Sequence, residues 1–117
     1  MYTVLLIEDH FDVASMMRLM LSRGGYCALL ASNLTEANQI WTAYKDEIHL
    51  VLTDNHLPDG SGIQFAAHLV REKPSLKVAV ASGNPDVDIP AGFYRIDKPF
   101  LAATLLNTLR LALSTNG

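Results

Sequence analysis

The sequence predicts an α/β fold in which one parallel sheet lies between two layers of helices. Short apolar segments alternate with amphipathic segments along the chain, and four apolar segments stop abruptly at polar or charged residues. Strands that alternate with helices form βαβ units with right-handed crossovers. Five such strands favour the flavodoxin-like order 2-1-3-4-5, a three-layer sandwich that binds ligands at the carboxyl ends of its strands. At 117 residues we expect one domain over 1–117.

The composition excludes several classes of protein. Half of the residues are hydrophobic and 18% are charged, as in an ordinary globular domain. The net charge is −3 and the basic residues are scattered, so we expect no nucleic-acid interface. A strand follows Met1 almost at once in place of a leader, and no apolar run is long enough for a bilayer. We therefore expect a cytoplasmic protein without a membrane partner. The single Cys27 excludes an internal disulfide, and its place in a strand predicts burial.

The first strand and helix have clear local signals. Tyr2 to Ile7 is a β-rich run that ends at Glu8-Asp9. Apolar residues at helical spacing then predict a helix that stops at Gly24-Gly25. They are Phe11, Ala14, Met17 and Leu21. Tyr26 to Ala31 is the second expected strand.

A capping signal begins the second helix. Asn33 can cap its first turn, and Glu36, three residues on, can return the hydrogen bond as in a capping box. This helix carries apolar residues from Leu34 to Tyr44. The central strand then begins near Ile48 and stops at the carboxylate of Asp54. A turn-forming stretch with Pro58, Gly60 and Gly62 follows.

The second half of the chain repeats the alternation. Apolar residues from Ile63 to Val70 predict a third helix, which stops before Pro74. Lys77 to Ala81 is a fourth strand that ends at Ser82-Gly83. Phe93 to Ile96 is a fifth strand, and it ends at Asp97-Lys98-Pro99. The last helix is expected over Leu101 to Leu113, with a polar tail from Ser114 to Gly117.

The predicted strand order brings the strand ends together. Glu8-Asp9 and Asp54 lie on opposite lips of one crevice, with Ser82 and Lys98 beside Asp54. Converging carboxylates repel each other unless a cation lies among them, and their hard oxygens suit Mg²⁺. Lys98 adds a positive charge and Ser82 a hydroxyl, so Asp54 can attack phosphorus and form an aspartyl phosphate. Taken alone, each residue also has an ordinary interpretation, as a strand-end cap, a solvated carboxylate or a surface lysine.

These motifs together resemble the receiver domain of two-component response regulators, over essentially the whole chain. The resemblance rests on Glu8-Asp9, on Asp54 followed by Pro58 and Gly62, on Ser82-Gly83 and on Lys98-Pro99-Phe100. It implies a CheY-like fold, with Asp54 as the phosphoacceptor in a phosphorelay. It also implies that Ser82 and Lys98 contact the phosphoryl group, and that the Lys98–Pro99 peptide is cis.

The resemblance further implies a cofactor and a partner. Mg²⁺ is expected among Glu8, Asp9, Asp54 and the backbone carbonyl of His56. The phosphoryl donor is expected to be a histidine kinase or a histidine phosphotransfer domain. Such helices would dock beside the first helix, where Val13, Met16 and Met20 lie on one side. The remaining residues His10, His49 and His68 have no metal-ligand spacing.

Three features depart from the family pattern. Glu8 stands where a second aspartate is usual, and Arg95 stands where most receivers have an aromatic switch residue. Tyr94 is adjacent to Arg95 and faces the other side of its strand, so it cannot replace that aromatic. The stretch from Gly83 to Tyr94 contains two prolines, which leave room for one turn at most. We therefore expect the fourth helix of the family to be shortened or absent.

The final helix is unusually apolar from Leu101 to Leu113. A helix that is apolar nearly all round is normally covered on more than one side. We expect part of it to contact a second copy, a neighbouring domain or another partner. In the alternative interpretation, Leu111 and Leu113 are scattered surface leucines.

Two other functions are compatible with parts of the pattern. A pseudo-receiver would act only as an interaction domain without phosphorylation. A hydrolase would use Asp54 covalently, but it would carry a second acid where this chain has His56, and a cap insertion. We therefore predict a signalling phosphoacceptor that catalyses only its own phosphorylation and slow dephosphorylation. The sequence does not distinguish a stand-alone receiver from part of a larger regulator or hybrid kinase.

Overall fold

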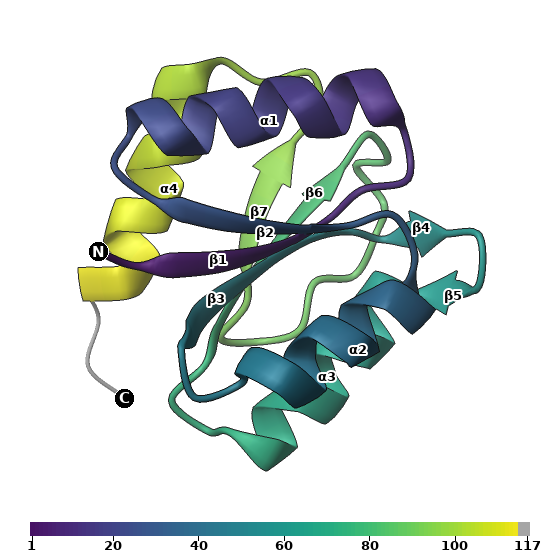
Figure 1. Ribbon diagram of the computed structural model, residues 1–117. Coiled ribbons are helices and arrows are strands. Elements are labelled where there is room, and N and C mark those ends of the chain that lie inside the picture. Colours follow the sequence, from purple (N-terminus) through teal and green to yellow (C-terminus); the bar gives the residue numbers. More distant parts are fainter. Residues whose placement is uncertain (115–117) are drawn as a thin grey trace.

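A parallel sheet of five strands runs through the middle of the molecule (Figure 1). The computed structural model describes residues 1–114, so the predicted tail beyond Ser114 lies outside the described residues. The strands are β1 (Thr3–Ile7), β2 (Cys27–Ala31), β3 (Ile48–Asp54), β6 (Lys77–Ser82) and β7 (Tyr94–Asp97). Their spatial order is β2-β1-β3-β6-β7, which confirms the predicted 2-1-3-4-5 order. A two-stranded hairpin, β4 (His56–Leu57) and β5 (Gly60–Ser61), follows β3.

Four helices cover the two faces of this sheet. On one face lie α1 (Phe11–Arg23) and α4 (Ala102–Ser114), and on the other lie α2 (Leu34–Tyr44) and α3 (Gly62–Glu72) (Figure 1). Side chains alternate between the faces, as a strand buried on both sides requires. Leu6 of β1 packs with α1 and α4, for example, and its neighbour Leu5 packs with α2. The predicted three-layer sandwich is therefore confirmed.

The N-terminus of α2 differs in one detail from the prediction. The Asn33 side chain accepts a hydrogen bond from the Glu36 N–H at 2.8 Å, as expected of the cap. The Glu36 carboxylate, however, accepts from the N–H and hydroxyl of Ser32 and not from Asn33. These bonds hold the pKa of Glu36 below its usual range. The prediction of a reciprocal capping box was wrong, because the carboxylate reaches one residue further back.

The burial of Cys27 was also predicted wrongly. Cys27 begins β2, which lies at one edge of the sheet, and its side chain is exposed. Burial along β2 increases toward its other end, where Ala31 is fully buried. An edge strand has only one sheet neighbour, so strand residues there are not buried simply because they are in a strand.

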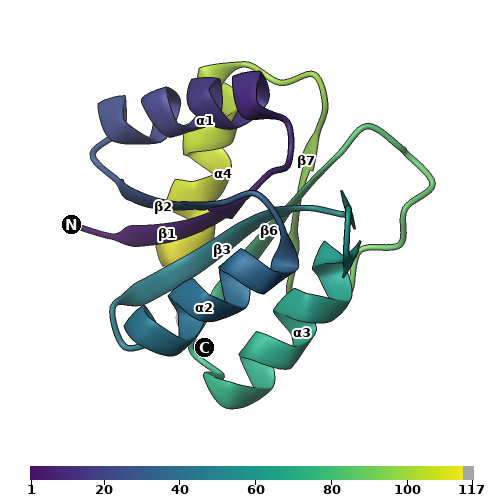
Figure 2. The ribbon, with the colours of Figure 1, turned by 45° about the vertical axis from the view of Figure 1, so that its right-hand side comes forward.

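No helix forms between β6 and β7 in the described chain, as predicted for the fourth helix of the family. The β6–β7 loop, residues 83–93, instead runs outward beside α3 and returns to β7 (Figure 2). Two of its side chains, Ile89 and Phe93, pack against Ala66 of α3 and against Val78 and Val80 of β6. The loop thus covers the part of the sheet that a helix would otherwise cover.

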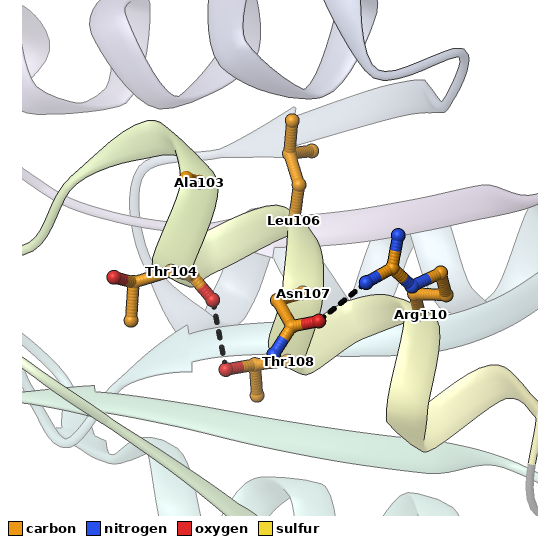
Figure 3. A pocket seen from close by; sticks show the side chains of 6 residues that line it. All are labelled: Ala103, Thr104, Leu106, Asn107, Thr108 and Arg110. Carbon is orange, nitrogen blue, oxygen red and sulfur yellow. Dashed lines mark hydrogen bonds between the residues drawn. The ribbon is translucent and has the colours of Figure 1, made fainter.

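The apolar residues of α4 are not all buried, although its sequence is apolar nearly all round. Leu105, Leu109 and Ala112 are buried, whereas Leu111 is 54% exposed and Leu101, which precedes the helix, is 74% exposed. The rest of its outer face is largely polar, with Thr104, Asn107, Thr108 and Arg110 around a shallow hollow (Figure 3). Within the described residues, no helix combines the length and apolarity that crossing a membrane requires.

Candidate functional site

The strand register brings the predicted site residues to one edge of the sheet. Ile7 pairs with Thr53, so Glu8 follows β1 beside the end of β3. Asp54 pairs with Ala81, and Ser82 pairs with Asp97, so Ser82 and Lys98 follow on the other side of Asp54. Four strand ends therefore supply the rim of one site.

Lys98 connects two carboxylates at this edge. Its Nζ lies 3.3 Å from Glu8 Oε2 and 3.3 Å from Asp54 Oδ2. The Glu8 side chain is 1% exposed and the Lys98 side chain 24% exposed, so this cation offsets a carboxylate that water hardly reaches. A buried carboxylate without such a partner would be costly. One ammonium group thus holds Glu8 and Asp54 on either side of it.

The backbone around Asp54 fixes its side chain. Asp54 Oδ1 accepts a hydrogen bond from the Asn55 N–H at 2.8 Å, and the Thr53 hydroxyl donates to the Asp54 carbonyl at 2.8 Å. Gly62, at the start of α3, lies directly against this point: a Cβ there would collide with the Asp54 carbonyl oxygen and the Thr53 hydroxyl. Its N–H also donates to the Asn55 carbonyl at 2.9 Å. Glycine is required because of this close approach.

Asp59 binds the loop after Asp54 to the N-terminus of α2. Its carboxylate accepts from the N–H groups of Leu34 and Thr35 at 2.8 and 3.0 Å, and from the Thr35 hydroxyl. These bonds lower the pKa of Asp59, and the carboxylate also faces the positive end of α2. The loop that carries His56 is thus held at its far end as well as by β3.

A compact group of possible metal ligands lies at the end of β1. Ligand atoms of Glu8, Asp9 and His10 all lie within 4.8 Å of one another. His10 Nδ1 is 3.1 Å from Glu8 Oε1 and 3.5 Å from Asp9 Oδ1. Asp9 Oδ1 is buried and has no hydrogen-bond partner within the described part of the chain, which fits a carboxylate oxygen that takes a cation. Asp54 is not in this compact group.

Two histidines lie near the site, and the surroundings of one of them, His10, differ from expectation. Sequence reasoning set His10 aside for lack of ligand spacing, yet its ring contacts Glu8. Its position directly after Glu8-Asp9 was the signal that was missed. His56 lies in β4, just beyond Asp54, with an exposed side chain, and its proposed role concerns only its backbone carbonyl.

The hydroxyl of Ser82 is held by its own loop. Ser82 is 5% exposed; its Oγ accepts from the Asn84 N–H at 3.1 Å and donates to the Asn84 carbonyl at 3.3 Å. Its backbone carbonyl accepts from the Lys98 N–H at 2.9 Å, just before the Lys98–Pro99 peptide, which is cis. Ser82 and Lys98 are therefore joined through the backbone, although the Ser82 hydroxyl points its hydrogen bond toward Asn84.

Comparison with known proteins identifies one family. The family model for the response regulator receiver domain matches residues 4–110. The chain is 29% identical to the response regulator receiver protein CpdR of Brucella abortus, over 93% of this chain and 94% of CpdR. It is 31% identical to the transcriptional regulatory protein VxrB of Vibrio cholerae and 29% to PhoB of Pseudomonas aeruginosa, over 95% and 98% of this chain. The chain spans about half the length of those two regulators, 46% and 53%.

Solved structures show the same fold. A receiver domain from Clostridium thermocellum is 25% identical and superposes with a TM-score of 0.89, over 97% of this chain and 94% of that one. The receiver domain of an HD domain-containing protein from Pseudomonas fluorescens is 28% identical with a TM-score of 0.85, over 96% and 94% of the two chains. The architecture is thus common to the two domains and this chain.

Proposed function

The chain belongs to the response regulator receiver domain family of two-component signalling, and we propose that Asp54 is its phosphoacceptor. The observation that carries the proposal is the position of Lys98 Nζ, 3.3 Å from both Glu8 Oε2 and Asp54 Oδ2. This arrangement supplies a carboxylate nucleophile, held by the Asn55 N–H, beside a cation that can neutralise phosphoryl oxygens. The proposed unit is one receiver domain over residues 1–117.

In the proposed reaction, an Asp54 carboxylate oxygen attacks the phosphorus atom of a phosphohistidine. The new O–P bond forms as the P–N bond breaks, and the electron pair of that bond passes to the imidazole nitrogen, which is protonated from solvent. Lys98 leaves its contact with the Asp54 carboxylate to pair with the incoming phosphoryl oxygens, and Ser82 donates its hydroxyl hydrogen to one of them. Water later hydrolyses the acyl phosphate, which releases phosphate and restores the carboxylate.

The residues present fit Mg²⁺, which receiver domains bind at an acidic pocket. We propose that Glu8, Asp9, Asp54 and the His56 carbonyl hold the ion. The support for this assignment is a set of hard oxygen donors that includes Asp9 Oδ1, buried and without a hydrogen-bond partner among the described residues. When bound, Mg²⁺ would neutralise charge on the phosphoryl group. The longer Glu8 side chain is expected to affect the affinity for the ion more than the chemistry.

The test is phosphorylation with a small donor. With Mg²⁺ and acetyl phosphate, intact mass spectrometry should show the gain of one phosphoryl group, and Asp54→Asn should abolish it. Asp46→Asn is a matched control, because Asp46 is exposed in the turn before β3, at the other end of the strand from Asp54. A wild-type protein that gains no Mg²⁺-dependent adduct with acetyl phosphate or beryllofluoride would contradict the proposal and favour a pseudo-receiver.

We propose that a kinase or phosphotransfer helix docks beside α1. Receiver domains of this family receive phosphoryl groups from histidine kinases, and here Val13 and Met16 line a hollow next to Lys98, Pro99 and Phe100. The hollow is largely apolar and opens beside the ammonium group of the site. Val13→Asp should slow phosphotransfer from a cognate donor while acetyl phosphate still modifies Asp54. Tyr44→Asp is the control, because Tyr44 is exposed on α2, which covers the other face of the sheet from α1.

A second contact is proposed through two exposed leucines, one just before α4 and one within it. Leu101 and Leu111 are the exposed large apolar side chains of this end of the chain. Sedimentation at high concentration, with and without beryllofluoride, tests self-association, and a monomer in both conditions would contradict it. The cytoplasmic location stays a prediction.

A further inference from the structure

The side chain of Arg95 binds the loop that replaces the missing helix. Its Nη1 donates to the Val87 carbonyl at 2.8 Å and its Nη2 to the Asn84 carbonyl at 2.7 Å. Its Nε donates to Asp97 Oδ1 at 2.7 Å, an ion pair along β7. The Arg95 side chain is 27% exposed, so these bonds are partly shielded from water. One planar guanidinium group therefore joins two loop carbonyls to strand β7.

The Asn84 carbonyl oxygen is shared with the phosphorylation site. Besides Arg95, it accepts from the Ser82 hydroxyl at 3.3 Å and from the Val87 N–H at 3.3 Å. Asn84 also donates its own N–H to Ser82 Oγ at 3.1 Å. A change in the hydrogen bonding of Ser82 therefore changes the set of donors to the same oxygen that Arg95 binds.

The Ser82 hydroxyl has a single hydrogen to donate. It can be given to the Asn84 carbonyl or to a phosphoryl oxygen on Asp54, but not fully to both. A charged phosphoryl oxygen is the stronger acceptor, because hydrogen bonds to ionised groups are shorter and stronger than neutral ones. Phosphorylation would therefore withdraw one donor from Asn84.

We propose that Arg95 is a positioning residue that couples Ser82 to the β6–β7 loop. The proposal rests on the proposed function of Asp54. When Ser82 turns to the phosphoryl group, Asn84 shifts, and the rigid guanidinium fork transmits the shift to Val87, whose carbonyl it also binds. The loop then moves relative to α3 and β6, against which its side chains Ile89 and Phe93 pack. This polar link takes the place of an aromatic switch residue and of a fourth helix together.

A simple structural role for Arg95 makes a different prediction. If Arg95 only fastens the loop, its removal would loosen the loop equally with and without a ligand on Asp54. If it couples the two, its removal would abolish the response of the loop to that ligand. The response, and not loop order alone, is the quantity to measure.

Amide NMR spectra of ¹⁵N-labelled protein can follow the site and the loop separately. The Asn55 N–H donates to Asp54 Oδ1 and reports on the site, whereas the Phe93 N–H donates to the Pro90 carbonyl and reports on the part of the loop beyond Val87. Mg²⁺ and beryllofluoride are added to the wild type, to Arg95→Gln and to Arg95→Lys. The Lys variant retains the charge but cannot bind both carbonyls in one plane, so we expect it to resemble Gln. Arg71→Gln, exposed on α3, is the control.

In the wild type we expect both reporters to shift on addition of beryllofluoride. In the Arg95 variants the Asn55 shift should persist and the Phe93 shift should be lost. A Phe93 shift that survives in Arg95→Gln, or that is missing from the wild type although Asn55 shifts, would overturn the coupling alone. An Asn55 amide that does not respond in the wild type would overturn the proposed function of Asp54, on which the coupling depends.

Discussion

The site at Asp54 and the β6–β7 loop lie at the same end of the sheet but are stabilised by different means. The site is made of charged side chains, each placed directly by the end of a strand: Glu8 by β1, Asp54 by β3 and Lys98 by β7. In the loop, the Arg95 side chain binds the backbone carbonyls of Asn84 and Val87, and Ile89 and Phe93 pack on the sheet and α3. The site follows the family pattern except at Glu8, and the loop departs from it. Charged side chains are thus placed on rigid strand ends, whereas the connection between β6 and β7 is built differently.

Among the substitutions that test this comparison, we expect Gly62→Ala to have the largest effect. A Cβ at this position collides with the Asp54 backbone carbonyl and with the Thr53 hydroxyl, both in β3. We expect a loss of about 3 kcal/mol in the free energy of unfolding, measured by urea denaturation, and slower phosphorylation. Gly83→Ala is the matched control, because its added Cβ would find only Lys98 Cβ, at 3.9 Å. Equal stabilities of the two variants would contradict rigid placement of the site.

Lys98→Gln tests the charges of the same site. Without the ammonium group, the buried Glu8 carboxylate loses its cation, and we expect the free energy of unfolding to fall by about 2 kcal/mol. This is less than the loss for a fully buried ion pair, because Lys98 is partly exposed. Mg²⁺ should raise the melting temperature of Lys98→Gln more than that of the wild type, since a cation again lies among the carboxylates. Lys77→Gln, at the other end of β6, should respond like the wild type. An identical Mg²⁺ response in all three proteins would show that Lys98 is not the balancing charge.

Phe93→Ala weakens the loop without touching the site. Phe93 is half-buried against α3 and β6. We therefore expect the free energy of unfolding to fall by about 1.5 kcal/mol, roughly half the cost of removing a fully buried phenylalanine. Phosphorylation of Asp54 by acetyl phosphate should keep its wild-type rate. A rate that falls in step with stability would mean that the loop and the site are one unit. Leu101→Ala, at a 74% exposed position, should leave both quantities unchanged.

The smallest effect is expected far from both regions. His49 Nδ1 accepts a hydrogen bond from the Thr3 N–H at 3.0 Å, and burial, with the charges of Lys73 and the N-terminus, lowers the pKa of His49. Its contribution to stability is therefore complete above pH ~6.5, the usual histidine value, and is lost as the pH falls below it. We expect the free energy of unfolding to fall by about 0.5 kcal/mol between pH 7 and pH 5.5 for this reason. His49→Gln, which keeps an acceptor but does not titrate, should remove this part of the pH dependence of urea denaturation.

Much of the fold and the placement of the site could be read from the sequence. Apolar runs that stop at Glu8, Asp54, Ser82 and Lys98 predicted the strands, and the strand order placed those residues at one edge of the sheet. The absence of a helix in the β6–β7 connection followed from its two prolines. The roles of these site residues in phosphorylation stay predictions.

Other features could not be read in the same way, for a physical reason. Arg95 binds carbonyl oxygens, and every residue has one, so its partners leave no mark in the sequence. Asp59 caps α2 from a loop about two dozen residues away in the chain, and that contact exists only once α2 packs on the sheet beside this loop. His10 was missed because spacing rules for metal ligands do not consider a residue that directly follows two carboxylates.

The bridge made by Lys98 has a consequence for the order in which the protein is assembled. Lys98 lies 90 residues from Glu8 and 44 from Asp54 along the chain. During synthesis, the acidic end of β1 leaves the ribosome long before the lysine that neutralises it, and a domain generally folds as a unit. A nascent chain that has made β1 and β3 but not β7 has its carboxylates without their cation. The sheet edge is therefore expected to stay open to water until β7 is added, so that the site is completed among the last steps of folding.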